Sequence, residues 1–215
     1  MQLRKFSLVV LVFVAVVFSG CASFRNNEIA TVDKLPDVMQ FKNKPTAFID
    51  AHLYRGERGS KASEILTNKD KVHEVIGKTV SGTNFFSKYS FNDVDKAGSD
   101  YVIKIDIYNH GNEALAFFSG FITGFTFGVV PGAAKDNFTI IMQLSDRSGT
   151  VISEVTNKDS VTTWVGLWFI PAMGNTPEKA FNGTLENQLR AALKDLVESG
   201  KIKYSHLLKL ECLFS

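Results

Sequence analysis

The sequence has little cysteine and no excess of charge of either sign. It contains only Cys21 and Cys212 among 215 residues, with 24 Lys and Arg against 22 Asp and Glu. Two cysteines cannot build a disulfide framework or a cysteine-based metal site. A nucleic-acid-binding chain normally shows a clustered basic surface, which this balance does not suggest. We therefore expect no nucleic-acid partner.

The common catalytic and cofactor motifs are missing as well. The chain has no Gly-x-Ser-x-Gly elbow, no His-Glu-x-x-His, no glycine-rich phosphate loop and no Cys-x-x-Cys. Its four histidines, His52, His73, His110 and His206, are scattered singly. The sequence therefore predicts a protein that is not an enzyme, with no catalytic residues, no metal and no cofactor.

The first 20 residues have the pattern of a secretory signal. Arg4 and Lys5 form a charged start, and an almost wholly apolar run follows from Leu8 to Phe18. About 11 apolar residues are too few for a bilayer span, which takes roughly 20. The run also lies where a signal peptide belongs. We interpret residues 1–20 as a cleaved signal peptide.

The end of this segment, Phe18-Ser19-Gly20-Cys21, resembles the bacterial lipobox, although Phe18 stands where Leu is common. The resemblance implies that Cys21 is joined to diacylglycerol and then acylated on its amino group, which makes the membrane a partner. Because Ala22 and Ser23 follow the cysteine instead of aspartate, the lipoprotein sorting rule implies an outer-membrane protein that faces the periplasm. Two or more acyl chains on one residue hold a protein stably on a membrane.

The remaining chain is predicted to form a tether, one domain and a tail. Residues 21–45 have few apolar positions, which is typical of a flexible tether. Residues 46–203 are expected to form an α+β periplasmic domain that contains an apolar excursion at 114–134. Residues 204–215, which include Cys212, would be a C-terminal tail.

Alternating and helical patterns predict the elements of this domain. Strands are expected at 47–54, 85–91, 101–108, 138–144 and 151–163, and helices within 62–81 and from Pro177 to Gly200, the second capped by Thr176. The predicted fold class is α+β, with an antiparallel or mixed sheet of about five strands and two helices on one face. Its order is β-α-β-β-(apolar excursion)-β-β-α. The pattern resembles the compact domain of several proteobacterial outer-membrane lipoproteins, most clearly at 99–103 and 146–151.

The excursion 114–134 carries no charge, and its glycines recur at every fourth residue. On one helix these glycines would form a stripe for close packing with another backbone. They are Gly120, Gly124, Gly128 and Gly132. The phenylalanines Phe117, Phe121, Phe125 and Phe127 share one parity, which instead fits an extended hairpin with one aromatic face. Three interpretations of the excursion stay open: insertion into the membrane, contact at a partner or membrane surface, or a hydrophobic loop or short helix pair that covers one edge of the sheet.

A second uncharged stretch, 160–177, should lie at the same end of the domain, because the predicted strands carry the chain back to that end. Surplus apolar surface there would mark an interaction site. The candidate contact residues are Phe117, Phe118, Phe121, Phe125, Phe127, Trp164, Trp168 and Phe169.

These observations favour a lipid-anchored envelope protein that works by contact. It would assemble, brace or regulate another envelope component, through a protein partner or by self-association. Two alternatives stay open: a subunit of an oligomeric, membrane-inserting pore or export channel that uses 114–134, or a carrier for an apolar ligand in a cavity behind the aromatic stretches.

Overall fold

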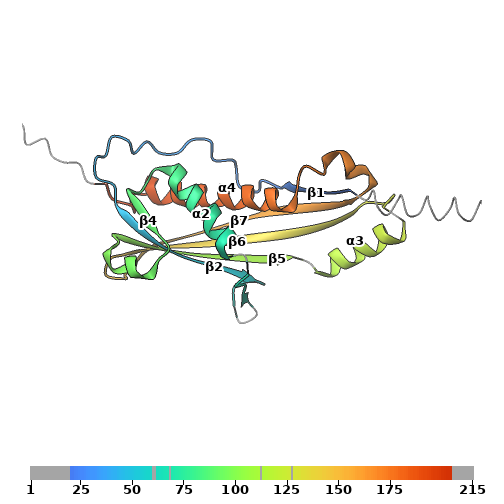
Figure 1. Cartoon of the computed structure of the whole chain (residues 1–215), viewed down its shortest axis with the longest axis horizontal. Coiled ribbons are helices and arrows are strands. Elements are labelled where there is room, and N and C mark those ends of the chain that lie inside the picture. Colours follow the sequence, from blue (N-terminus) through green and yellow to red (C-terminus); the bar gives the residue numbers. More distant parts are fainter. Residues whose placement is uncertain (1–19, 60–61, 68, 112, 127, 205–215) are drawn as a thin grey trace, which may run out of the picture. The chain divides into compact units, whose positions relative to one another are not determined.

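The computed structural model describes residues 20–59, 62–67, 69–111, 113–126 and 128–204 (Figure 1). The predicted signal peptide up to residue 19, the candidate contact residue Phe127, and the tail from residue 205 with Cys212 lie outside the described residues.

The described strands form one mixed sheet, in the order β1-β7-β6-β5-β2-β3, with β4 paired to β2. Their bounds are β1 (Gly20–Arg25), β2 (Thr46–Arg55), β3 (Ser63–Glu64), β4 (Lys88–Ser90), β5 (Tyr101–Gly111), β6 (Gly132–Asp146) and β7 (Val151–Gly166). β1 pairs with β7 and β3 with β2 in antiparallel fashion, whereas β4 runs parallel to β2. The α+β class is confirmed, but the sheet has seven strands instead of about five because the sequence patterns missed β1 and β3.

Three α-helices and two 3-10 helices accompany the sheet in the described part of the chain. They are α2 (Lys69–Thr83), η1 (Asp93–Gly98), α3 (Glu113–Phe125), η2 (Leu167–Ala172) and α4 (Pro177–Glu198). Helix α4 begins as predicted, and the Thr176 hydroxyl oxygen accepts a hydrogen bond from the Lys179 backbone N–H at 3.2 Å. Helix α2 lies within the predicted range 62–81 except for its last two residues, and Ser63 and Glu64 before it pair with β2 as strand β3.

The chain divides into two compact units. Unit 1 comprises residues up to Glu28, Asn109–Phe138 and Asp159–Leu185, and unit 2 comprises Ile29–Tyr108, Thr139–Lys158 and the chain from Glu186. β5, β6, β7 and α4 each contribute residues to both units.

Each unit buries its own apolar side chains. In unit 1, Phe138, Val161 and Ala180 form a buried cluster with Phe181 packed against it. The Phe138 and Phe181 rings lie 5.2 Å apart between centroids at an angle of 58°. In unit 2 the fully buried side chains include Ile76 of α2, Ile103 and Ile105 of β5, Met142 of β6 and Leu189 of α4.

The first part of the predicted tether is a strand, which differs from the expected flexible linker. β1 pairs along its whole length with the end of β7, from Gly20 opposite Gly166 to Arg25 opposite Val161. The polar side chains that suggested a linker are paired instead: the Ser23 and Thr163 hydroxyls lie 2.7 Å apart, and the Asn26 amide donates to the Ser160 hydroxyl at 2.7 Å. Polar composition therefore did not indicate a free chain here.

The next part of the predicted tether is also held, along α4 within unit 2. The Val32 backbone N–H donates to Asn187 Oδ1 at 2.9 Å, and Asn187 Nδ2 donates to the carbonyls of Ile29 and Ala30 at 3.3 Å each. Arg190 Nη2 donates to the Val32 carbonyl at 3.1 Å. Residues 29–32 are thus fixed by the side chains of one helix face.

Candidate functional site: an apolar cluster beside Cys21

The uncharged excursion folds mainly as helix α3, which ends at Phe125 and is followed by a turn into β6. The extended hairpin that the phenylalanine parity suggested is therefore wrong. At 13 residues α3 is well short of the roughly 20 that a helical span needs. Among the described helices, none is long and apolar enough to cross a membrane.

The four glycines do not form one helical stripe, because only Gly120 and Gly124 belong to α3. A Cβ at either position would meet nothing within 4 Å. Gly128 lies in the following turn with φ of 80°, a conformation that favours glycine. Gly132 begins β6 against α3, where a Cβ would overlap the Thr123 hydroxyl and lie 2.9 Å from the Ser119 carbonyl. Close packing is thus a property of Gly132 alone among the four.

Several large apolar side chains of unit 1 remain exposed, on α3, on the turn after it and around η2. We call them the apolar cluster: Phe121, Ile122, Phe125, Val129, Val130, Val165, Trp168 and Met173. Three of these are predicted contact residues, with exposed fractions of 64% for Phe121, 79% for Phe125 and 71% for Trp168. The aliphatic members were not among the predicted contact residues, which are all aromatic, although the uncharged stretches contain all eight.

The other predicted contact residues behave differently. Trp164 and Phe169 are half-buried and stack on each other, with ring centroids 5.5 Å apart and planes at 23°. Their rings therefore contribute to the packing of unit 1. Phe117 and Phe118 lie on α3, but the structure does not describe their side chains.

The two uncharged stretches meet, as the predicted topology required. The Leu167 backbone N–H donates to the Gly128 carbonyl at 3.1 Å, and Trp168 Nε1 donates to the Val129 carbonyl at 2.9 Å. Gly166 has φ of 156°, and a Cβ there would lie 3.0 Å from the Gly128 carbonyl. The close approach of the two backbones therefore depends on glycine at position 166.

Cys21 lies next to these residues, in β1 directly opposite Val165 of the apolar cluster. The start of β1 also touches η2, since a Cβ at Gly20 would lie 2.6 Å from the Phe169 carbonyl carbon. The Ser23 backbone N–H donates to the Asn175 carbonyl at 2.8 Å, just after η2. In Figure 1, β1 runs beside β7 with its first residues at η2. Residue 21 is therefore held in a paired strand opposite Val165, one member of the apolar cluster, and not at the end of a linker.

Polar contacts after β1 reinforce this placement. The Lys135 ammonium donates to Glu28 Oε1 at 2.8 Å, and the Ser160 hydroxyl donates to the same oxygen at 2.6 Å. The hydrogen bond from Lys135, followed by that from Ser160, holds the pKa of Glu28 below its usual value. The Glu28 carboxylate is thus ionised near neutral pH and ties the chain after β1 to β6 and β7.

A group of titratable side chains lies in unit 2, around His52. Its Nδ1 is 2.7 Å from Glu64 Oε1 and its Nε2 is 2.9 Å from Asp50 Oδ1. Partial burial lowers the pKa of His52, but the hydrogen bond to Glu64 and the nearby Asp50 charge outweigh it, so the pKa is raised. Within the described part of the chain, no three His, Cys, Asp or Glu side chains are grouped to hold a metal ion.

No protein-family model matches the chain, and no curated protein matches its sequence. The solved structures that are similar to its fold include the following three. A minor lipoprotein from Acinetobacter baumannii is 8% identical with a TM-score of 0.37, over 76% of this chain and 98% of that one. The PelC dodecamer from Paraburkholderia phytofirmans is 9% identical with a TM-score of 0.37, over 82% and 97%. The hypothetical protein CT253 from Chlamydia trachomatis is 10% identical with a TM-score of 0.43, over 73% and 99%.

Proposed function

We propose that this chain is a lipid-anchored outer-membrane lipoprotein that acts without catalysis as an assembly, structural or regulatory adaptor in the cell envelope. Acyl chains on Cys21 would hold it on the periplasmic side of the membrane, and the apolar cluster would lie on the same membrane. The observation that carries the proposal is the pairing of Cys21 with Val165, which brings the predicted lipidation site to the exposed apolar side chains.

The position of Cys21 at the start of a folded strand supports this membrane placement. When cleavage occurs before Cys21, the mature chain begins inside β1, because that strand starts at Gly20. The acyl chains would then leave from the edge of a folded sheet, with no linker to let the body move away. Each buried methylene contributes about 0.8 kcal/mol to membrane affinity, and adjacent apolar side chains add to this at about 25 cal/mol per Å² of buried apolar surface.

The chemistry of Trp168 suits a membrane surface. Its indole is largely exposed, yet its one N–H already donates to the Val129 carbonyl. A ring that enters lipid with its N–H paired avoids the cost of an unsatisfied polar group. Tryptophan also favours the boundary between lipid and water. Residues 114–134 and 160–177 carry no charged side chain, so burying these segments at a lipid surface would not require desolvating a charge.

Tryptophan fluorescence tests this placement, because the chain has two tryptophans and both lie near β1. The processed, acylated Trp164→Phe variant in nanodiscs reports on Trp168 alone. We expect bromine-labelled lipids to quench Trp168 strongly. The half-buried Trp164, observed in Trp168→Phe, should be quenched less. Equal and weak quenching of both residues would contradict membrane contact by the cluster.

A matched pair of substitutions separates the cluster from general surface hydrophobicity. Phe125 and Met39 are each 79% exposed, but Met39 belongs to unit 2. Phe125→Ser should weaken membrane retention of the acylated protein about tenfold, which corresponds to about 1.4 kcal/mol, whereas Met39→Ser should change it little. Fatty-acid labelling that fails to mark the protein, or that persists in Cys21→Ser, would overturn the anchor itself.

The adaptor role needs a test of its own. Photo-crosslinkers at Phe121 and Trp168 in intact cells should capture lipid and, where a partner shares this surface, one envelope protein or a second copy of this chain. The carrier alternative would need a cavity behind the aromatic stretches, whereas the 940 Å³ cavity of unit 2 is lined by other residues.

A further inference from the structure

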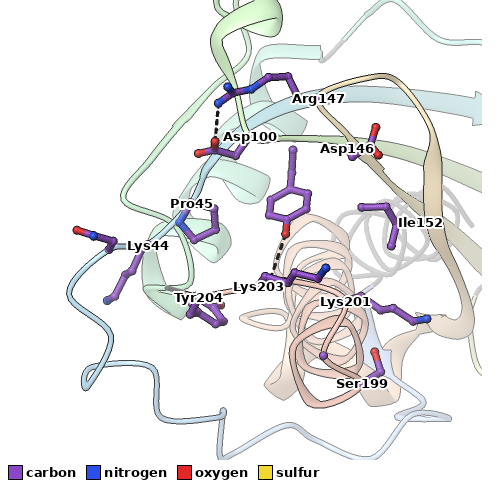
Figure 2. Close-up of a pocket in the computed structure, with 13 residues that line it drawn as sticks. Lys44, Pro45, Asp100, Asp146, Arg147, Ile152, Ser199, Lys201, Lys203 and Tyr204 are labelled. Carbon is purple, nitrogen blue, oxygen red and sulfur yellow. Dashed lines mark hydrogen bonds and ion pairs between the residues drawn. The ribbon is translucent and has the colours of Figure 1, made fainter. Parts of the chain in front are cut away.

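Unit 2 contains an open cavity of about 940 Å³ that the apolar cluster does not share. Its walls come from the segment before β2, the start of β5, the β6–β7 turn and the chain after α4 (Figure 2). The volume lies within the range of about 300–1,000 Å³ that is typical of small-molecule sites.

Both acidic groups in the wall already accept hydrogen bonds from donors of the protein. Asp100 accepts from the Thr46 backbone N–H and hydroxyl at 2.9 Å each, and from Arg147 Nη2 at 2.7 Å. The backbone hydrogen bond from Thr46, with the hydroxyl and Arg147 contacts, holds the pKa of Asp100 below its usual value. Asp146 accepts from the backbone N–H groups of Ser148 and Thr150 within its own turn. These carboxylates therefore offer little to a ligand.

The remaining side-chain groups of the wall include several donors. Lys201 and Lys203 are exposed, and neither ammonium has an ion-pair or hydrogen-bond partner among the residues that the structure describes. In Figure 2 both side chains extend to the same side of the cavity as Ile152. The Tyr204 hydroxyl is buried with no hydrogen-bond partner in the described chain, and burial raises its pKa, so it stays protonated as a donor.

Tyr101 adds a further donor. Its hydroxyl oxygen accepts from the Lys203 backbone N–H at 3.0 Å, which leaves the hydroxyl proton for another partner. This contact also fixes the backbone of the segment that carries Lys203. Pro45 and Ile152 supply apolar wall that can accommodate the organic part of a ligand.

We propose that this cavity binds a phosphate-bearing ligand, with Lys201 and Lys203 as the cationic contacts and the Tyr204 hydroxyl as a hydrogen-bond donor. A phosphate ester presents several acceptor oxygens and a full negative charge. Donors at different positions of the cavity wall can therefore bind it at the same time. Lysine serves such a group as a compact point charge. The inference does not rest on the proposed function, because it uses no residue of the apolar cluster.

The ligand chemistry has two possible sources, which one experiment separates. The processed full chain in nanodiscs of zwitterionic lipid is titrated with glycerol phosphate by calorimetry. A second sample uses discs that contain phosphatidylglycerol, and binding is followed from changes in the Tyr204 environment by NMR. Saturable binding of glycerol phosphate points to a soluble phosphate ester. A response to phosphatidylglycerol alone points to a lipid headgroup. Either result supports the phosphate site.

Substitutions test the named contacts. Lys201→Gln combined with Lys203→Gln should weaken binding at least tenfold, and Tyr204→Phe should weaken it several-fold while keeping the stack on Phe41, whose ring centroid lies 4.9 Å away. Lys78→Gln, an exposed lysine of α2 outside the cavity, is the matched control and should leave affinity unchanged.

Three results would overturn the proposal: no saturable response in either sample, equal affinity for the double variant and the unaltered protein, or binding of uncharged glycerol as tight as that of its phosphate. Unchanged unfolding temperatures of the variants show that any loss of binding is not a loss of fold.

Discussion

Gly124 and Gly132 share a sequence spacing but not an environment. Gly124 lies on α3 with open space around the position of a Cβ, whereas Gly132 at the start of β6 has Ser119 and Thr123 against it. The Ala133 backbone N–H also donates to the Ser119 hydroxyl, which fixes the start of β6 against α3. The role of a glycine thus depends on what faces it, which spacing alone does not show.

Gly132→Ala should destabilise the protein by about 1–3 kcal/mol, because the added methyl group forces the Ser119 and Thr123 side chains and their backbone to move. Gly124→Ala is the control and should be neutral or slightly stabilising, since alanine is the better helix former. Urea unfolding followed by circular dichroism measures both. Equal stability of the two variants would contradict the close approach at Gly132.

His52 should make stability depend on pH. Its pKa is raised in the folded protein by Glu64 and Asp50, so the fold favours the protonated imidazole. The stabilisation is complete below the unfolded pKa of about 6.5 and is lost as the pH rises through the folded pKa. NMR titration of the imidazole should show the raised value in the native protein and a lower one in Glu64→Gln. An unshifted titration in both proteins would rule out this ion pair.

At the level of elements, local patterns predicted the strands and helices whose own residues alternate or recur. β2, β5, β7 and α4 appear where the sequence placed them, with ends displaced by a few residues. β1 and β3 were missed because their own sequences show no clear strand pattern. Each is a strand because it pairs with a neighbour, β1 with β7 and β3 with β2. Strand propensity depends strongly on such context.

The start of α4 offers a test at this scale. Thr176→Ala should cost about 1 kcal/mol, because the Lys179 N–H loses the side-chain oxygen that caps the helix. Thr176→Ser keeps that oxygen and should stay close to the original stability. Thermal unfolding of the three proteins gives the comparison, and a Ser variant as unstable as the Ala variant would argue against capping.

For the whole molecule, the position of Cys21 within the paired strand β1 is the feature on which the proposed membrane contact depends. Ten Gly and Ser residues inserted between Cys21 and Ala22 should leave acylation intact but let the folded body leave the membrane surface. We expect bromine-labelled lipids to quench Trp168 less in this variant, with fatty-acid labelling unchanged. Undiminished quenching would mean that the position of Cys21 in β1 does not determine the membrane contact.

The sequence alone determined the α+β class, most of the long elements and the two uncharged stretches that form the apolar cluster. These features depend on side-chain type and periodicity within short segments, which are visible along the chain. Only the tertiary structure decided that Cys21 lies against Val165, that Trp168 is exposed while Trp164 is half-buried, and that Lys201 and Tyr204 line a cavity with Asp100. Contacts of this kind join residues up to 158 positions apart, and their geometry follows from packing and hydrogen bonding that no local pattern encodes.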